Sequence, residues 1–150
     1  MAEALYTIDI LRLAASTSQW PALAVPDGSA ERRSPTCGSR VRVDVGCDVE
    51  GRVAVIGVHV SACALGQAST AIMAGHALGR SGTDFRAVRA ALAAYLTGES
   101  ESLPDWPGIG TLAPARAYPA RHASILLAFE AAAEAMDAAH AAAQESRAHG

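Results

Sequence analysis

Hydrophobic and polar residues alternate most regularly between residues 40 and 60. In the first half of this stretch every second residue is Val or Cys, and most residues between them are Arg or Asp, which is the pattern of a half-buried β-strand. Glu50-Gly51 then provides a short turn, and a second run rich in β-branched residues extends from Arg52 to Val60. We therefore predict an antiparallel hairpin. Its buried face would carry Val41, Val43, Val45, Cys47 and Val49, which makes Cys47 a core thiol.

Apolar residues at helical spacing occur on both sides of this hairpin. Before it, a helix over residues 4–15 would place one stripe on Ala4, Ile8, Leu11 and Ala15. After it, a helix from Ala64 to Leu78 is rich in small residues, which let a neighbouring backbone approach closely. Gly79 suits the left-handed position that ends such a helix.

Two more helices are predicted in the second half of the chain. The first is capped by Thr83 and stops at Gly98, with a buried side formed by Phe85, Val88, Leu92 and Leu96. The second is Ala-rich and runs from about Ala120 to His140, with one face formed by Ile125, Phe129, Ala132 and Met136. The polar tail, residues 144–150, is expected to fray.

Two segments show neither the helical nor the β-strand spacing of apolar residues and are expected to be irregular. Pro21 to Pro35 is rich in Pro, Gly, Ser and charge and is predicted to be a surface arm, and Glu99 to Pro119 is predicted to be a long connection. The order helix, arm, hairpin and three helices indicates an α+β fold, with a small antiparallel sheet packed against several helices. The length of 150 residues fits one domain, 1–150, in which residues 1–36 supply the first helix and the arm.

Composition and charge narrow the possible locations and partners. The net charge is −3, all 12 basic residues are Arg, and no basic cluster along the sequence suggests nucleic acid or an anionic membrane as a partner. No apolar run approaches the roughly 20 residues that span a bilayer, and the N-terminus lacks the pattern of a signal peptide. We therefore expect a cytoplasmic protein whose three cysteines stay reduced and serve as ligands, nucleophiles or core residues.

Two of these cysteines occupy positions where a thiol can act. Cys37 precedes Gly38 at the mouth of the first strand, where the backbone can approach a ligand closely. Cys63 lies where the second strand passes into a helix, and the free N–H groups and helix dipole there favour a thiolate. Metal binding and sulfur transfer both need the thiolate. The alternative, that both cysteines are small hydrophobic residues in an Ala-rich core, remains open.

The other chemically active residues form weaker patterns. His122 begins the last helix beside Arg121 and is either a surface residue or, as a neutral imidazole, a metal ligand. His59, shortly before Cys63, is a weaker candidate. Nothing in the sequence aligns a general base with a nucleophile, so we do not expect an enzyme.

These elements together resemble a known family. The run Ser34-Pro35-Thr36-Cys37-Gly38-Ser39, the hairpin, Cys63 with its small-residue helix, and a terminal Pro-x-Arg helix resemble the U-type iron–sulfur assembly proteins IscU, SufU and the N-terminal part of NifU. The resemblance covers roughly residues 5–139. It implies the U-type scaffold fold, in which three Cys and one Asp hold a nascent [2Fe–2S] cluster or zinc and accept sulfur from a cysteine desulfurase.

The C-terminal part resembles the SUF branch. Tyr118-Pro119-Ala120-Arg121 is similar to its aromatic-Pro-x-Arg, and Leu127-Ala128-Phe129 to its Leu-Ala-Trp. This register places Ser124 at the third Cys position, whereas an ISC-type register places Ala123 there. Ser39 stands where the family has Asp. The Leu-Pro-Pro-Val-Lys motif that binds an Hsp70-type chaperone corresponds to Ala117–Arg121, so an Hsp70-type partner is not expected.

The resemblance thus implies a site and a set of partners. Cys37 and Cys63 would accept persulfide or bind metal, His122 would be a further metal ligand, and the rest of the site would be lined by Ser39, Arg121 and Ser124. The cofactor would be a transient [2Fe–2S] cluster or iron, or else zinc. The partners would be a cysteine desulfurase and iron–sulfur acceptor proteins. Two alternatives stay open: a degenerate paralogue that acts as adaptor or regulator of a desulfurase without binding metal, and a Cys/His zinc-binding module.

Overall fold

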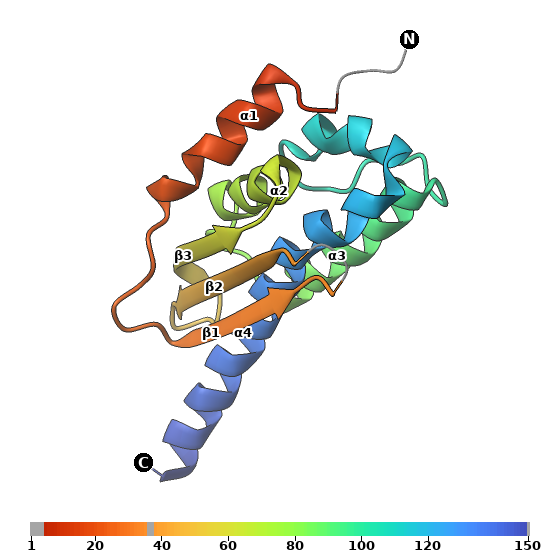
Figure 1. Cartoon of the computed structure of the whole chain (residues 1–150). Coiled ribbons are helices and arrows are strands. Elements are labelled where there is room, and N and C mark those ends of the chain that lie inside the picture. Colours follow the sequence, from red (N-terminus) through yellow and green to blue (C-terminus); the bar gives the residue numbers. More distant parts are fainter. Residues whose placement is uncertain (1–4, 36–37, 150) are drawn as a thin grey trace.

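The structure, a computed structural model, describes residues 5–35 and 38–149. Thr36 and Cys37, and with them one of the two predicted site cysteines, lie outside the described residues. Three strands form one antiparallel sheet in the order β1-β2-β3: β1 Gly28–Arg33, β2 Arg40–Cys47 and β3 Val53–Ser61 (Figure 1). The α+β fold class is therefore confirmed.

The predicted hairpin is formed by β2 and β3. Its ladder extends from Arg40 opposite Ser61 to Cys47 opposite Val53, with an irregularity between Gly46 and Cys47. Val41, Val43 and Val45 are fully buried, as the alternation predicts. Val49 lies beyond the end of β2 and is exposed, so the buried stripe is shorter than predicted because the strand ends first.

Strand β1 corrects the prediction of an irregular arm between Pro21 and Pro35. Residues 28–33 pair with β2 along their whole length, although their sequence, Gly-Ser-Ala-Glu-Arg-Arg, has no apolar alternation. An edge strand forms its ladder through backbone groups, so a polar sequence can satisfy it. Gly28 lets this strand lie close to the last helix, since a Cβ there would overlap the backbone of Ala135 and Ala139.

The rest of the arm covers part of the outer face of the sheet. The amide of Val58 donates to the carbonyl of Trp20 over 2.8 Å, and a Cβ at Gly57 would overlap the carbonyl oxygen of Pro21. Asp44 on β2 is buried under this segment and accepts hydrogen bonds from the Leu23 amide at 3.1 Å and from Ser29 Oγ at 2.7 Å. The arm is thus fixed to the sheet by a buried carboxylate.

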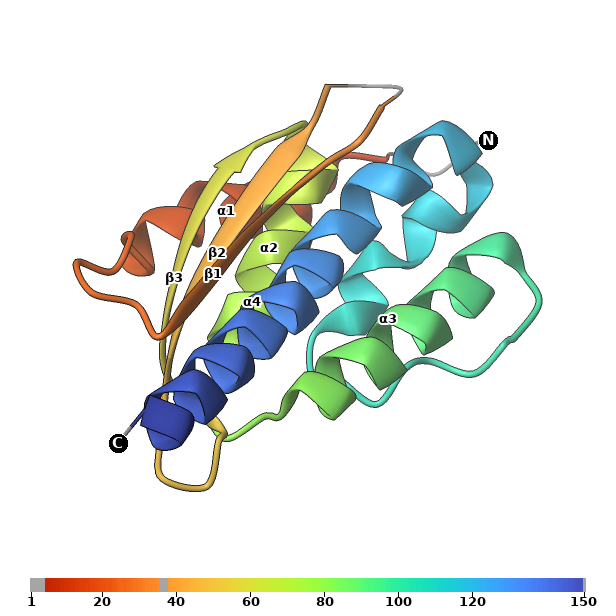
Figure 2. The same ribbon diagram turned by 90° about the horizontal axis from the view of Figure 1, so that it is seen from below.

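Three long helices lie on one side of the sheet, two of them directly against it: α2 Ala64–Gly75 and α4 His122–His149 contact the strands, and α3 Gly82–Thr97 forms a further layer. Figure 2 shows the sheet nearly edge-on, with these helices on one side of it. Helix α4 contacts β1 and β2, α2 contacts α4 and β3, and α3 packs on the far side of α4. The core lies between these layers.

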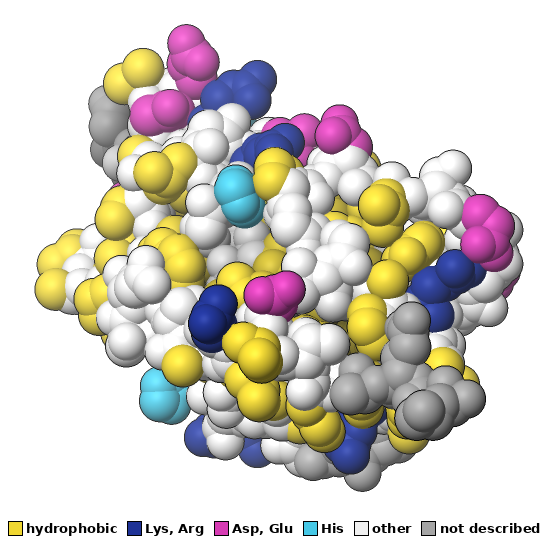
Figure 3. Space-filling view, turned by 90° about the horizontal axis from the view of Figure 1, so that it is seen from above, with side chains coloured by type: hydrophobic (Ala, Val, Ile, Leu, Met, Phe, Trp, Pro, Cys, Tyr) yellow, Lys and Arg dark blue, Asp and Glu magenta, His cyan; other side chains and the backbone are white. Residues whose placement is uncertain are grey.

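Helix α1, Ile8–Ala15, packs on α2 through a different face from the one predicted. Its buried residues are Ile10 and Ala14, whereas the side chains expected to be buried, Ile8 and Leu11, are 67% and 50% exposed. Figure 3 looks down on this end of the molecule and shows hydrophobic side chains at its surface. The two-turn helix begins only at its Thr7 cap, and it contacts the core through Ile10 and Ala14, with the partly buried Leu13 packed beside them.

The boundaries of α2 and α3 differ slightly from prediction. Helix α2 ends at Gly75 and not at residue 78, and Gly79 has the predicted positive φ of 83° in the turn that follows. Ser81, not Thr83, caps α3, because its hydroxyl accepts from the amide of Asp84 in a reciprocal capping box. Gly98 ends α3, as predicted, and it adopts the left-handed conformation.

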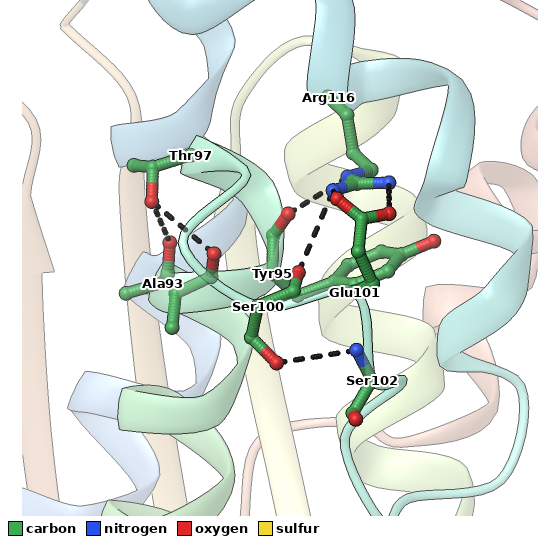
Figure 4. Close-up of polar contacts among 8 residues, drawn as sticks. Ala93, Tyr95, Thr97, Ser100, Glu101, Ser102 and Arg116 are labelled. Atoms are coloured by element: carbon green, nitrogen blue, oxygen red, sulfur yellow. Dashed lines mark hydrogen bonds and ion pairs between the residues drawn. The ribbon is translucent and has the colours of Figure 1, made fainter.

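The connection from α3 to α4 is ordered by two short 3-10 helices, η2 Ile109–Ala117 and η3 Pro119–Arg121. Arg116 in η2 ties it to the end of α3 (Figure 4). Its Nε donates to the carbonyl of Tyr95 at 2.8 Å, and its two terminal nitrogens contact the carboxylate of Glu101 at 2.9 and 3.1 Å. These hydrogen bonds lower the pKa of Glu101.

Helix α4 has the predicted buried face but a later end. Ile125, Phe129, Ala132 and Met136 are all buried. The helix continues to His149, so most of the tail predicted to fray, residues 144–150, is helical. None of the helices described is both long and apolar enough to cross a membrane.

Candidate functional site

Cys63 lies at the junction between β3 and α2, as predicted. It is the N-cap residue of α2, with an extended backbone (φ −64°, ψ 169°), and its side chain makes no capping hydrogen bond. The thiol is half-buried. It therefore stands at the helix end where backbone N–H groups have no partner within the helix, and solvent can still reach it.

Two buried hydroxyl groups continue inward from this thiol. Ser124 in the first turn of α4 is fully buried, and its Oγ lies 3.6 Å from the Sγ of Cys63. The same Oγ donates a hydrogen bond to the Oγ of Ser39 over 3.0 Å, and Ser39 is itself buried at the start of β2. The structure thus joins three predicted site residues in one row, although they come from three separate elements.

Small residues allow α2 and α4 to meet at this point. A Cβ on Gly66 would lie 2.5 Å from the Oγ of Ser124, so only glycine fits there without displacing that side chain. One turn further along α2, Ser69 donates to the carbonyl of Ile125 over 2.6 Å. The close approach predicted from the small residues of α2 is therefore confirmed, and it sets the position of Ser124.

Arg121 and Cys63 border the same shallow hollow in the surface. The hollow is lined by Gly38, Ser39, Ser61, Ala62, Cys63 and Arg121. Gly38 has a φ of +71°, a left-handed conformation that glycine adopts easily. The site is therefore an open depression at the end of the sheet and not an enclosed cavity, which suits a reactant presented by a large partner.

His122 does not join this row in the structure. Its Nε2 lies 2.9 Å from the carbonyl oxygen of Ala115. Because a carbonyl oxygen only accepts, Nε2 must be the protonated nitrogen, and only Nδ1 could bind a metal. Its neighbour Ala123 is exposed, so Ser124 is the residue of this turn that faces Cys63.

Cys47 lies away from this site, at the other end of β2. It packs against the core, with its Sγ 3.8 Å from the Sδ of Met136, and it remains partly exposed beside the strand irregularity. Burial, with the nearby charges of Asp27 and Asp48, raises the pKa of its thiol. A structural role as a core thiol agrees with this environment.

The described residues do not assemble a metal centre. Within residues 5–35 and 38–149, no group of three or more His, Cys, Asp or Glu side chains could hold a metal ion. Cys63 is the thiol they contribute to the hollow, and its Sγ lies 3.6 Å from the hydroxyl of Ser124. Zinc therefore has no support in this part of the chain.

Sequence reasoning missed the direct bond between Ser39 and Ser124. No signal along the chain pairs two serines that are 85 positions apart. The resemblance placed both residues at the site, but only the packing of α4 against the mouth of the hairpin brings their hydroxyls together.

Comparisons with known proteins place the chain in a family. No described sequence family and no curated protein matches it. A crystal structure of a nitrogen-fixing NifU-like protein (N-terminal) from Brucella abortus matches with 35% identity and a TM-score of 0.80, covering 91% of this chain and 94% of that one.

Two more distant structures share the fold. One is a candidate iron–sulfur cluster assembly scaffold of the SUF system from Fervidobacterium islandicum, with 17% identity and a TM-score of 0.79, covering 88% of this chain and 96% of that one. The other is a hypothetical protein with 21% identity and a TM-score of 0.63, covering 85% of this chain and 96% of that one. These two structures show the fold alone, whereas the Brucella match confirms the family expected from the cysteine pattern: the chain belongs to the NifU-like proteins of the U-type scaffold family.

Proposed function

We propose that this protein takes part in iron–sulfur cluster assembly as a sulfur acceptor and scaffold, with Cys63 as the central residue. The observation that carries the proposal is the Cys63 thiol itself, which is half-exposed at the N-cap of α2 beside an open hollow. Sulfur transfer needs a cysteine sulfur that a donor protein can reach, and this one borders the open hollow. One of the structures that share this fold is named as a candidate scaffold for iron–sulfur cluster assembly.

The sulfur transfer would move one sulfur atom from a donor persulfide to the thiolate of Cys63. The Cys63 thiolate attacks the outer sulfur of a persulfide on a cysteine desulfurase. A bond forms between Sγ and this sulfur, the S–S bond of the donor breaks, and its electron pair leaves on the donor cysteine as a thiolate. The step needs no external oxidant or reductant, because one S–S bond breaks on the donor as another forms on Cys63. One exposed thiol is enough for this step.

Holding iron or a [2Fe–2S] cluster as cargo needs more donors. A [2Fe–2S] cluster is commonly bound by four cysteine thiolates, whereas the hollow offers Cys63 and the hydroxyl of Ser39, which is bonded to the buried Ser124 behind it. Cargo binding would therefore depend on Cys37 together with Cys63 and on external thiols or a second subunit, with Nδ1 of His122 as a further donor. Arg121 would offer a positive charge to the anionic cargo. We expect a cytoplasmic protein, and iron–sulfur acceptor proteins would take the cargo on.

The experiment that tests this proposal is persulfide transfer followed by mass spectrometry. The reduced protein is incubated anaerobically with a cysteine desulfurase and cysteine, and the sulfur on each peptide is measured. We expect a mass increase of one sulfur on the Cys63 peptide that is lost in Cys63→Ala. The matched control is Cys47→Ala, which should not change the result. A Cys63 peptide that never gains sulfur would refute the proposal.

The geometry also favours a second function, that of an adaptor for a desulfurase that carries neither sulfur nor metal. The specific observation is the hydrogen bond between Ser124 and Ser39, which holds two neutral hydroxyls where the resemblance expects a thiolate and a carboxylate. The two functions differ in what the cysteines do. Binding of a desulfurase that persists unchanged in the double variant Cys37→Ala and Cys63→Ala, with no sulfur on the wild type, would establish the adaptor function.

A further inference from the structure

The outer face of the sheet has an open half beside Cys63. Its other half is covered by residues 20–23, which bury Asp44 and Gly57. Because side chains alternate across the strands, the register places two cross-strand rows on the open half. One row consists of Glu31, Arg42 and His59, and the other, nearer the hollow, of Arg33, Arg40 and Ser61.

The arginines of these rows, here called the arginine face (Arg33, Arg40 and Arg42), are open to solvent. Their side chains are 67%, 39% and 50% exposed, respectively. Ser61, the cross-strand partner of Arg40, also lines the hollow that contains Cys63. The arginine face is therefore continuous with the candidate site, and Arg121 extends it across the hollow.

The carboxylates around the arginine face do not fully neutralise it. Glu31 is the only acidic residue of the two rows, and it is shared between Arg33 at 3.3 Å and Arg40 at 3.8 Å. The Nε of Arg40 is buried and makes no hydrogen bond with any residue that the structure describes. Arg42 is paired with the buried Asp44. The face thus carries excess positive charge in a chain whose net charge is −3.

We propose that the arginine face is the docking surface for an acidic segment of the protein that delivers sulfur to Cys63. This inference rests on the proposed function, because it assigns a partner surface to the same site. The charge selects an acidic partner, and the position beside Ser61 places that partner at the hollow. The two rows span three strands, about 10 Å across at a spacing near 4.8 Å, which matches an extended acidic segment lying along the sheet.

The observations favour a protein over a nucleic acid as the partner. The arginine face includes one carboxylate in its middle, Glu31, and this charge would oppose a regularly charged phosphate backbone. A mixed face of this kind matches a protein surface, on which charges of both signs alternate. It would raise the association rate with an acidic partner more than the final affinity.

The test measures how fast Cys63 gains sulfur from two donors, a desulfurase from the same genome and a small-molecule persulfide. The variant is the double change Arg33→Gln and Arg40→Gln, and the single change Arg33→Gln is used if the double variant fails to show a normal unfolding transition. The matched control is Arg52→Gln. This residue is exposed and lies before the nine-residue β3, roughly 30 Å from Ser61 at about 3.4 Å per residue.

We expect the double variant to slow transfer from the desulfurase about tenfold at low salt and to leave transfer from the small molecule unchanged. The difference should vanish near 1 M salt, where the Debye length is about 3 Å. Glu31→Gln should have the opposite effect and raise the rate of transfer from the desulfurase. Equal slowing in Arg52→Gln, or a rate that neither variant nor salt changes, would overturn the docking surface while leaving the sulfur acceptor intact.

Two further outcomes are decisive. If Cys63 gains sulfur from neither donor, the proposed function fails, and the docking surface assigned to it fails with it. If a single-stranded oligonucleotide binds the wild type and this binding is lost in the arginine variant, the face recognises nucleic acid and the proposed occupant is wrong.

Discussion

The hydroxyl of Ser124 donates a hydrogen bond to the hydroxyl of Ser39 over 3.0 Å, and both residues are buried. This bond links the first turn of α4 to the start of β2, directly behind the Cys63 thiol. The resemblance expects a thiolate and a carboxylate at these two positions. The bond therefore joins two neutral side chains, which leave no buried charge at this point.

The first prediction follows from the distance between Ser124 and Cys63. Two sulfurs bound to one tetrahedral metal at about 2.3 Å lie roughly 3.8 Å apart, and the Ser124 Oγ lies 3.6 Å from the Cys63 Sγ. We expect Ser124→Cys to retain more zinc or iron than the wild type after dialysis under reducing conditions, as measured by elemental analysis. The matched control is Ala123→Cys, whose side chain is exposed. Equal metal content in both variants would contradict the prediction.

The second prediction concerns Asp44 and acid stability. Burial alone would raise the pKa of this carboxyl, but hydrogen bonds from Ser29, the Leu23 amide and Arg42, with the charge of Arg42, together lower it below its ordinary value of 3.8. A carboxyl with a depressed folded-state pKa stabilises the fold above its unfolded-state pKa. This stabilisation is lost as the pH falls from about 5 through the folded-state pKa.

Asp44→Asn should therefore lower the free energy of unfolding at pH 7, by about 1–3 kcal/mol for the loss of a buried charged hydrogen-bond acceptor. It should also remove part of the decline in stability below pH 4, which urea unfolding measured at a series of pH values would reveal. Asp105→Asn, at an exposed position, is the control and should change neither. A variant as acid-sensitive as the wild type would show that Asp44 does not set this dependence.

The sequence predicted the parts of the fold whose pattern is local. The Val alternation of β2, the buried face of α4 and the position of Cys63 at the start of α2 all depend on nearest neighbours along the chain. Strand β1 was missed because its ladder uses backbone groups, and Gly28 gave no periodic signal. With it, the cross-strand placement of Arg33 beside Arg40 was also missed. A charged cluster that forms only when β1 pairs with β2 cannot be found in a linear sequence.

The third prediction concerns the reactivity of Cys47. Because burial and the carboxylates of Asp27 and Asp48 raise the pKa of this thiol above its ordinary value of 9.0, little reactive thiolate is present at neutral pH. We expect iodoacetamide to modify Cys47 at least about tenfold more slowly in the folded protein than in urea. The rate should still be rising at pH 9. Peptide mass spectrometry measures both, and a rate that reaches a plateau below pH 9 would contradict the shift.

The fourth prediction tests the close contact between β1 and α4. A methyl group at Gly28 would overlap the backbone of Ala135 and Ala139. The strand backbone is fixed by the β1–β2 ladder and the other backbone by helix α4, so neither can move aside as a flexible side chain can. Gly28→Ala should therefore separate the strand from the helix and lower the free energy of unfolding by about 1–3 kcal/mol, the usual cost of overpacking. The matched control is a glycine that has room for a methyl group.

This control is Gly75→Ala at the end of α2, where a methyl group would meet Trp20 at an ordinary distance of 3.6 Å. That change should be neutral or stabilise the protein by up to about 1 kcal/mol, since alanine favours a helix. Thermal and urea unfolding of the two variants measures the difference, and equal stabilities would mean that β1 does not lie against α4 in solution.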